Sequence, residues 1–120
     1  MINELAKQVH QNAKDHGFFD KEKNIGEMLC LIHSEVSEAL EADRKDNYCG
    51  TINGPVYGGD NDGFGHYFEE KIKHTFEDEM ADIVIRVMDL CAFKNIDLEA
   101  HIKAKMRYNS LREYKHGKKY

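Results

Sequence analysis

Hydrophobic residues recur at helical spacing along four segments of the chain. The segments cover residues 2–14, 25–44 and 76–91, and a fourth begins after Asp97. Apolar side chains that return every three or four residues form a stripe on one side of a helix, and Asp is a preferred N-cap. We predict an all-α protein whose helices turn these stripes inward. The stripes consist of Ile2, Leu5, Ala6, Val9 and Ala13; Ile25, Met28, Leu29, Ile32, Val36, Ala39 and Leu40; Phe76, Met80, Ile83, Val84, Val87, Leu90 and Cys91; and Leu98, Ile102 and Met106.

Residues 46–70 interrupt this pattern between the second and third predicted helices. The segment is rich in glycine and holds the only proline of the chain, Pro55. Glycine and proline mark turns and loops, so we expect a loop or small hairpin insertion. A loop of this length in a compact domain is usually functional or mobile.

Composition supports the helical prediction and narrows the choice of partner. At 120 residues the chain is long enough for one core, and we expect a single domain over residues 1–120. Charged residues make up 32% of the sequence, which suits a helical protein better than a β-sandwich. The formal net charge is −5, whereas binding of polymeric nucleic acid usually needs a broad basic face. Polymeric nucleic acid is therefore not an expected partner.

The amino terminus and the cysteines argue against export and membrane insertion. The start, MINELAKQ, carries charges where a signal peptide would be apolar, and the run ADIVIRVMDLCAF is interrupted by Arg86 and Asp89. Cys30, Cys49 and Cys91 form no CxxC motif and leave one cysteine unpaired, which favours a reducing compartment. We expect a cytoplasmic protein with no membrane partner.

Two pairs of acidic residues lie beside the apolar stripes of the second and third helices. Around the helix axis, Glu35 lies at about 80° and Glu38 at about 140° from the centre of the stripe. Glu79 and Asp82 occupy the same two positions on the third helix, about 80° and about 140° away on the same side. If the helices pack antiparallel through their stripes, the four carboxylates converge. Because converging carboxylates repel one another, the pattern predicts a divalent cation.

The residue types at this predicted site indicate which metal would bind and suggest a substrate that carries phosphates. Oxygen ligands without His or Cys favour Mg²⁺ or Mn²⁺, and Mg²⁺ typically bridges carboxylates to substrate phosphates. On the fourth helix, Lys105, Asn109 and Arg112 continue the line of the apolar stripe. Basic and amide groups of this kind neutralise and bind polyphosphate. The alternative is that the acidic pairs and the basic carboxyl end are solvated surface.

These segments resemble a known enzyme family. HSEVSEALEADR followed by FEDEMADIVIRVMDL resembles the ExxE…ExxD signature of the MazG-like, all-α nucleoside triphosphate pyrophosphohydrolases. KAKMRYNSLREYKHGK is similar to the stretch that closes small single-domain members. The resemblance covers most of the chain except the insertion, and the two acidic pairs are further apart than in the commoner members. It implies a four-helix MazG-like bundle with a long glycine-rich insertion between the second and third helices.

The resemblance also implies an activity. Members cleave a nucleoside triphosphate between the α and β phosphates with Mg²⁺, giving a nucleoside monophosphate and pyrophosphate, and they clean the nucleotide pool. By this resemblance the catalytic metal ligands would be Glu35, Glu38, Glu79 and Asp82. The substrate-binding candidates are Lys105, Asn109, Arg112, Lys115 and His116, together with Phe18, Phe19 and His33. The two Phe residues could stack on a base or anchor the connector, and His33 could touch substrate or be ordinary surface.

Other functions remain open at this point. A phosphoribosyl-ATP pyrophosphohydrolase would share the chemistry, and a non-catalytic helical protein could use the acids to bind a partner or a structural ion. A di-iron bundle would need Glu-x-x-His motifs on two helices, and the two acidic helices carry none.

The helices carry more apolar surface than four helices can bury. On the third helix, Ile85 and Met88 turn away from the main stripe, as do Cys30 and Leu31 on the second. We therefore expect a homodimer or a homotetramer.

Overall fold

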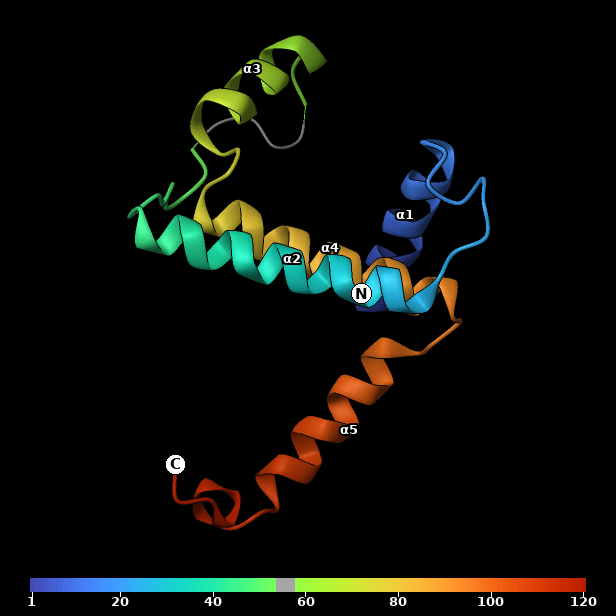
Figure 1. Ribbon diagram of the computed structural model, residues 1–120, viewed down its shortest axis with the longest axis vertical. Coiled ribbons are helices and arrows are strands. Elements are labelled where there is room, and N and C mark those ends of the chain that lie inside the picture. The colour runs from blue at the N-terminus through green and yellow to red at the C-terminus, as the bar shows by residue number, and fades with distance from the viewer. Residues whose placement is uncertain (54–57) are drawn as a thin grey trace. The chain divides into compact units, whose positions relative to one another are not determined.

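The computed structural model covers residues 1–120 and describes all of them except residues 54–57. The described residues form five α-helices and one 3-10 helix with no strand, so the all-α prediction is confirmed for this part of the chain. The helices are α1 (Ile2–Asp15), α2 (Ile25–Arg44), α3 (Asn61–Lys71), α4 (Phe76–Phe93), α5 (Leu98–Ser110) and the 3-10 helix η1 (Tyr114–Gly117), as Figure 1 shows. None of the described helices is both long enough and apolar enough to span a membrane.

Contacts divide the chain into two compact units. Residues 23–87 form the first, which we call the α2–α4 unit because it holds α2, α3 and most of α4. Residues 1–22 and 88–120 form the second, which we call the α1–α5 unit.

The predicted helix starts are set by side-chain caps. Asn24 precedes α2, and its side-chain oxygen accepts a hydrogen bond from the Glu27 backbone N–H at 3.1 Å. Asp97 caps α5 in the same way, accepting from the Ala100 N–H at 3.0 Å. Such caps satisfy backbone donors that the first helical turn leaves free. They explain why α2 and α5 start at the residues predicted from the sequence.

The insertion differs from the prediction. We expected a loop or small hairpin over residues 46–70, but α3 occupies its second half, and residues 54–57 lie outside the described residues. Asp60 caps α3 by accepting a hydrogen bond from the Gly63 N–H at 2.5 Å. Phe64 and Phe68 follow one helical turn apart with ring centroids 6.0 Å from each other. A cap and an apolar pair at this spacing outweigh the low helix propensity of glycine.

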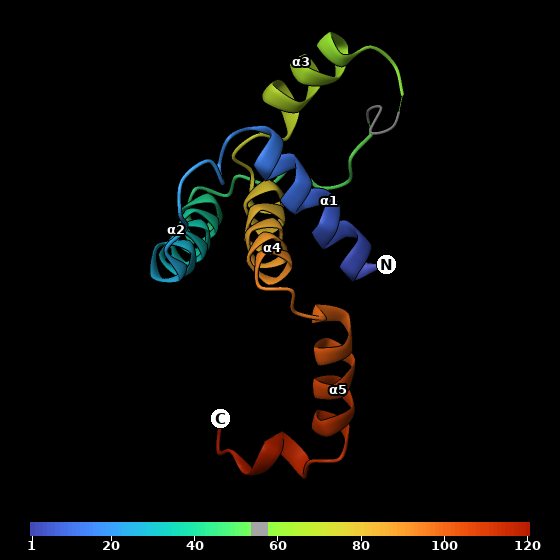
Figure 2. The ribbon, with the colours of Figure 1, turned by 90° about the vertical axis from the view of Figure 1, so that its right-hand side faces the viewer.

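Within the α2–α4 unit, α2 and α4 run antiparallel and lie side by side (Figures 1 and 2). On α2 the buried residues are Met28, Glu35, Ala39 and Ala42. Val36 and Leu40, which belong to the apolar stripe, are 51% and 49% exposed. The prediction that the stripe faces inward is therefore confirmed for Met28 and Ala39 and wrong for Val36 and Leu40. Ala39 and Ala42 lie on the side of α2 that also carries Glu35, so the buried side of the helix is rotated toward the acids.

The same rotation occurs on α4. Glu79 is 4% exposed, whereas Met80 and Val84 of the stripe are nearly half exposed. On both helices the exposed part of the stripe lies about 100° around the helix axis from the buried side. The rotation is in the sense in which the chain winds from one residue to the next. For two antiparallel helices that face each other, this rotation brings both stripes to one common face. Leu29, Val36 and Leu40 of α2 thus share a face with Met80 and Val84 of α4.

The α1–α5 unit is joined at the amino ends of its two helices. The Met1 ammonium and the Ile2 N–H donate hydrogen bonds to Glu99 Oε1 at 2.9 and 2.7 Å. The Asn3 side-chain amide donates to Asp97 Oδ1 at 2.7 Å. Further along, α5 buries no residue, and Met106 is 66% exposed. The prediction that the apolar stripe of α5 faces inward is wrong for Met106 and for Ile102, which is also exposed.

Candidate metal centre

Three of the predicted acids meet in the α2–α4 unit. Carboxylate oxygens of Glu35, Glu79 and Asp82 all lie within 4.8 Å of one another. Glu38, one turn after Glu35 on α2, interacts with the carboxyl groups of both Glu35 and Glu79. Antiparallel α2 and α4 therefore bring all four acids of the ExxE and ExxD pairs to one place, although not through the packing face that we expected.

Two of the four acids are buried, whereas Asp82 is half-buried and Glu38 is exposed. Glu35 and Glu79 are only 7% and 4% exposed. Arg86 Nε donates a hydrogen bond to Glu35 Oε1 at 2.8 Å, and this is the ion pair that crosses between α4 and α2. The second oxygen, Glu35 Oε2, is buried and has no hydrogen-bond partner among the described residues. An ionised carboxylate is an acceptor only, so ionised neighbouring carboxylates cannot satisfy this atom.

The pKa values of the four acids follow from this crowding. Burial raises the pKa of Glu79 and of Asp82, and the charges of neighbouring carboxylates add to the shift. The neighbouring Glu35 carboxylate raises the pKa of Glu38, because a proton on Glu38 can be shared with it and because the Glu35 charge opposes ionisation of Glu38. Burial alone would raise the pKa of Glu35, but the hydrogen bond and charge of Arg86 outweigh it and lower the pKa. The cluster thus has one well-stabilised carboxylate and three that resist ionisation.

A divalent cation fits this donor set. Four ionised carboxyl groups and one guanidinium carry a net negative charge, and repulsion within a partly dry site is stronger than in water. The ligand atoms of the four acids are hard oxygens, which suits Mg²⁺ or Mn²⁺ rather than softer metals. Glu35 Oε2 would gain the partner that the described residues do not provide.

Arg86 and His74 are two residues of this region that our sequence reasoning missed. We read Arg86 only as an interruption of an apolar run, yet it follows Asp82 by one helical turn and so faces the same side. His74 precedes α4 in a left-handed backbone conformation with φ of 67°. Its Nδ1 lies 3.6 Å from Glu79 Oε1, and its carbonyl accepts a hydrogen bond from Asn47 Nδ2 at 2.9 Å. No periodicity in the sequence indicates this turn.

The predicted phosphate-binding residues belong to the other unit. Lys105 and Arg112 lie on and just after α5, with their cationic groups 5.3 and 5.6 Å from the centroid of the Tyr108 ring. Asn109 lies between these two residues in the sequence and is half-buried. Lys115 and His116 lie in η1, both with left-handed backbone angles. Because these residues and the acids lie in different compact units, their joint action on one substrate stays a prediction.

The remaining candidates have different surroundings. The Phe19 ring packs against His10 and Phe93, with centroids 4.6 and 5.1 Å apart, which fits the role of a hydrophobic anchor for the connector. Phe18 is exposed. His33 is exposed on α2 and is not one of the three clustered residues.

Comparison with known proteins identifies no relative of this chain. No protein-family model matches the chain, and neither a curated protein nor a solved structure does so.

Proposed function

We propose that this protein is a Mg²⁺-dependent nucleoside triphosphate pyrophosphohydrolase of the MazG-like type, which cleaves between the α and β phosphates. The observation that carries the proposal is the cluster of Glu35, Glu79 and Asp82, in which the buried Glu35 Oε2 has no hydrogen-bond partner in the described part of the chain. Burying an unpartnered carboxylate oxygen is costly, so a fold that keeps one is best explained by a ligand that binds it. The resemblance of the two acidic pairs to the ExxE…ExxD signature supports the same conclusion.

In this proposal the acids hold the cation and the basic residues hold the substrate. Glu35, Glu38, Glu79 and Asp82 would supply the ligands, and bound Mg²⁺ lowers the pKa of water and neutralises phosphate charge. Arg86 keeps Glu35 ionised and oriented through the bond at 2.8 Å. One of the carboxyl groups of the cluster could accept the proton of the attacking water.

The carboxyl-terminal part of the chain would supply the residues that contact the substrate. Lys105, Asn109 and Arg112 would contact the phosphates, with Lys115 and His116 beside them. The two cations already gather around Tyr108, an arrangement that concentrates positive charge at this part of the α1–α5 unit. The finer fold, a MazG-like bundle with residues 46–70 inserted, belongs to the same proposal.

We also propose that the working form is a homodimer or homotetramer. The common face of α2 and α4 exposes Leu29, Val36, Leu40, Met80 and Val84, and an apolar face of this kind is typical of a protein–protein interface. Ile85 and Leu31 are exposed as well. Light scattering at micromolar concentration should report at least a dimer, and Val36→Glu should shift the species toward monomer. A monomeric parent would contradict this part of the proposal.

The activity is tested by a substrate screen that reads the product. Ordinary and modified nucleoside triphosphates and phosphoribosyl-ATP are incubated with Mg²⁺, with Mn²⁺ and with EDTA. We expect pyrophosphate release that requires the metal. Orthophosphate as the sole first product contradicts the proposed site of cleavage. Metal binding without any turnover would instead support the non-catalytic interpretation.

A further inference from the structure

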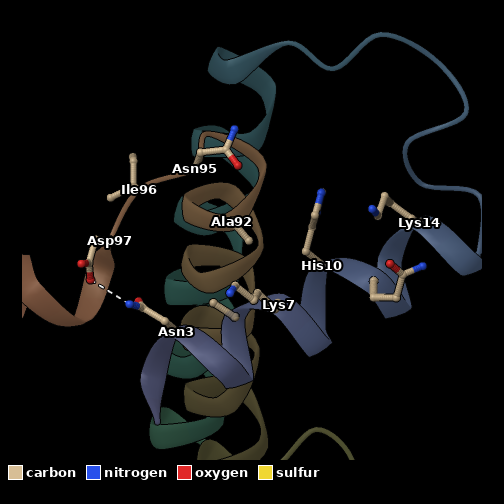
Figure 3. A pocket seen from close by; sticks show the side chains of 10 residues that line it. Asn3, Lys7, His10, Lys14, Ala92, Asn95, Ile96 and Asp97 are labelled. Atoms are coloured by element: carbon tan, nitrogen blue, oxygen red, sulfur yellow. Dashed lines mark hydrogen bonds between the residues drawn. The ribbon is translucent and has the colours of Figure 1, made fainter.

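A second candidate binding region lies in the α1–α5 unit and is independent of the acidic cluster. This region is a cavity of about 550 Å³. Its lining comes from one side of α1, the end of α4 and the segment that leads into α5, as Figure 3 shows. Its polar wall on α1 consists of Lys7, His10, Gln11 and Lys14. Asn95 and Ile96 lie on the opposite wall. The volume is in the range of small-molecule sites.

The electrostatic character of this cavity is positive. Lys7 and Lys14 both line it, and neither ammonium group forms an ion pair or hydrogen bond with a described residue. The one carboxylate in the wall, Asp97, already accepts hydrogen bonds from the Asn3 amide at 2.7 Å and from the Ala100 N–H at 3.0 Å. The donors to Asp97 are neutral, so it keeps its negative charge. The wall therefore carries two ammonium groups without a partner among the described residues and one carboxylate, which leaves an excess of one positive charge.

His10 gives the cavity a fixed polar centre. Its Nδ1 lies 2.8 Å from Asp89 Oδ1, and its ring stands edge-on to Phe19 with centroids 4.6 Å apart. A carboxylate partner on Nδ1 fixes the orientation of the ring and leaves Nε2 for a ligand. Gln11 follows on the same wall, and its amide nitrogen donates to Asp15 at 2.8 Å, which leaves its carbonyl oxygen available.

The spacing of the two lysines defines the shape of the ligand. Lys7 and Lys14 are seven residues apart, so their backbone positions differ by about 10 Å along α1, with His10 and Gln11 between them. A single small anion cannot sit close to both ammonium groups without drawing them together. We infer that this cavity binds an elongated small molecule with an anionic group at each end, carboxylate or phosphate, and a polar middle facing His10.

The test follows the His10 ring by NMR in the full chain, from which metal has first been removed on a chelating resin. Metal binding at the acidic cluster then does not contribute, and no soluble polycarboxylate competes with the probes. The probes are adipate, which has two carboxylates, 1,6-hexanediol bisphosphate, which has two phosphates, and acetate as the single-charge control. Chloride keeps the ionic strength constant. The variants are Lys7→Gln with Lys14→Gln, and a charge-matched control in the other unit, Lys45→Gln with Lys71→Gln.

We expect a saturable shift of the His10 signal with at least one of the two dianions, and the stronger of the two identifies the anionic group. Loss of both cavity lysines should weaken binding by about tenfold or more, because two partly exposed charge pairs are removed, whereas the control double variant should bind like the parent. A His10 signal that does not move, an equal effect of acetate at matched charge, or equal binding by both double variants would overturn the inference. All of these outcomes are independent of pyrophosphate release.

Discussion

Two sets of carboxylates, one in each compact unit, have opposite environments. In the α1–α5 unit, each of Asp89, Asp97 and Glu99 has a partner within the protein: His10, the Asn3 amide and the amino terminus. The amino-terminal ammonium and the Ile2 N–H lower the pKa of Glu99 to about 2. In the α2–α4 unit, by contrast, the pKa values of Glu79 and Asp82 are raised by burial and by other carboxylates.

This difference distinguishes acids that stabilise the folded state from acids that we propose to be ligands of a metal. A carboxylate with a lowered pKa contributes to the stability of the folded state once it is ionised. A carboxylate with a raised pKa lowers that stability when it ionises, so its presence needs another explanation. We therefore expect substitutions to have opposite consequences in the two units.

The largest expected effect is on activity. Glu38→Gln or Asp82→Asn keeps the side-chain shape but removes a charged ligand, so pyrophosphate release should fall by orders of magnitude as metal and water lose their alignment. Glu99→Gln is the matched control in the other unit and should retain activity. The assay is initial-rate pyrophosphate release at saturating Mg²⁺. Near-parental rates in both cluster variants would mean that these acids are structural.

A smaller effect is expected from the basic residues of the α1–α5 unit. Lys105→Ala or Arg112→Ala removes a charged contact to phosphate that typically contributes about 1.5–3 kcal/mol, or roughly one to two decades in nucleotide affinity. Mg²⁺ binding to the metal centre should not change, because neither residue is proposed as a ligand. Calorimetry with a non-hydrolysable nucleotide and with Mg²⁺ alone separates the two effects. Unchanged nucleotide binding in both variants would assign these residues to solvated surface.

Measurements of stability also test the difference between the acids of the two units. Asp97→Ala removes the N-cap of α5 and should lower the free energy of unfolding. Asp82→Asn in EDTA should leave the melting temperature level or raise it, because it relieves repulsion. Added Mg²⁺ should stabilise the parent more than Asp82→Asn, since a ligand that binds only the folded state stabilises it by mass action. An Asp82→Asn variant that melts far below the parent in EDTA would contradict this view.

The smallest expected effect is a difference in pH dependence. The pKa values of Glu38, Glu79 and Asp82 are raised in the folded state, from ordinary values of 4.5, 4.5 and 3.8. The folded protein therefore binds these protons more tightly than the unfolded chain, and their contribution to stability is lost as the pH rises through the raised pKa values. Glu35, whose pKa is lowered, acts in the opposite direction but is one group against three.

Thermal melts in EDTA from pH 4 to pH 7 measure this contribution. The parent should lose more stability over that interval than Asp82→Asn. Glu99 and Asp97 contribute in the opposite sense, because their lowered pKa values give stability that is lost as the pH falls below the ordinary carboxyl range. If the stability of the parent and of Asp82→Asn changed equally with pH, the proposed repulsion among the acids would be contradicted.

Local features of the fold could be predicted from the sequence, and α2 illustrates why. Its apolar period and its Asn24 cap act within a few residues, so the helix could be placed from residue 25 to residue 44. The insertion was harder to predict because the glycines around α3 argue for a loop. The helix exists because the Asp60 cap and the Phe64–Phe68 pair act together, a balance that composition alone does not reveal.

The sequence by itself determined the four acids, their pairing along each helix and the hard-oxygen character of the cluster, because these depend on residue type and on spacing within one helix. Only the tertiary structure decided which side of each helix is buried. That choice depends on contacts between segments far apart in sequence, such as Arg86 with Glu35 and Asn47 with His74. The packing rotated the interface toward the acids, exposed Val36 and Leu40, and left Glu35 Oε2 without a protein partner among the described residues.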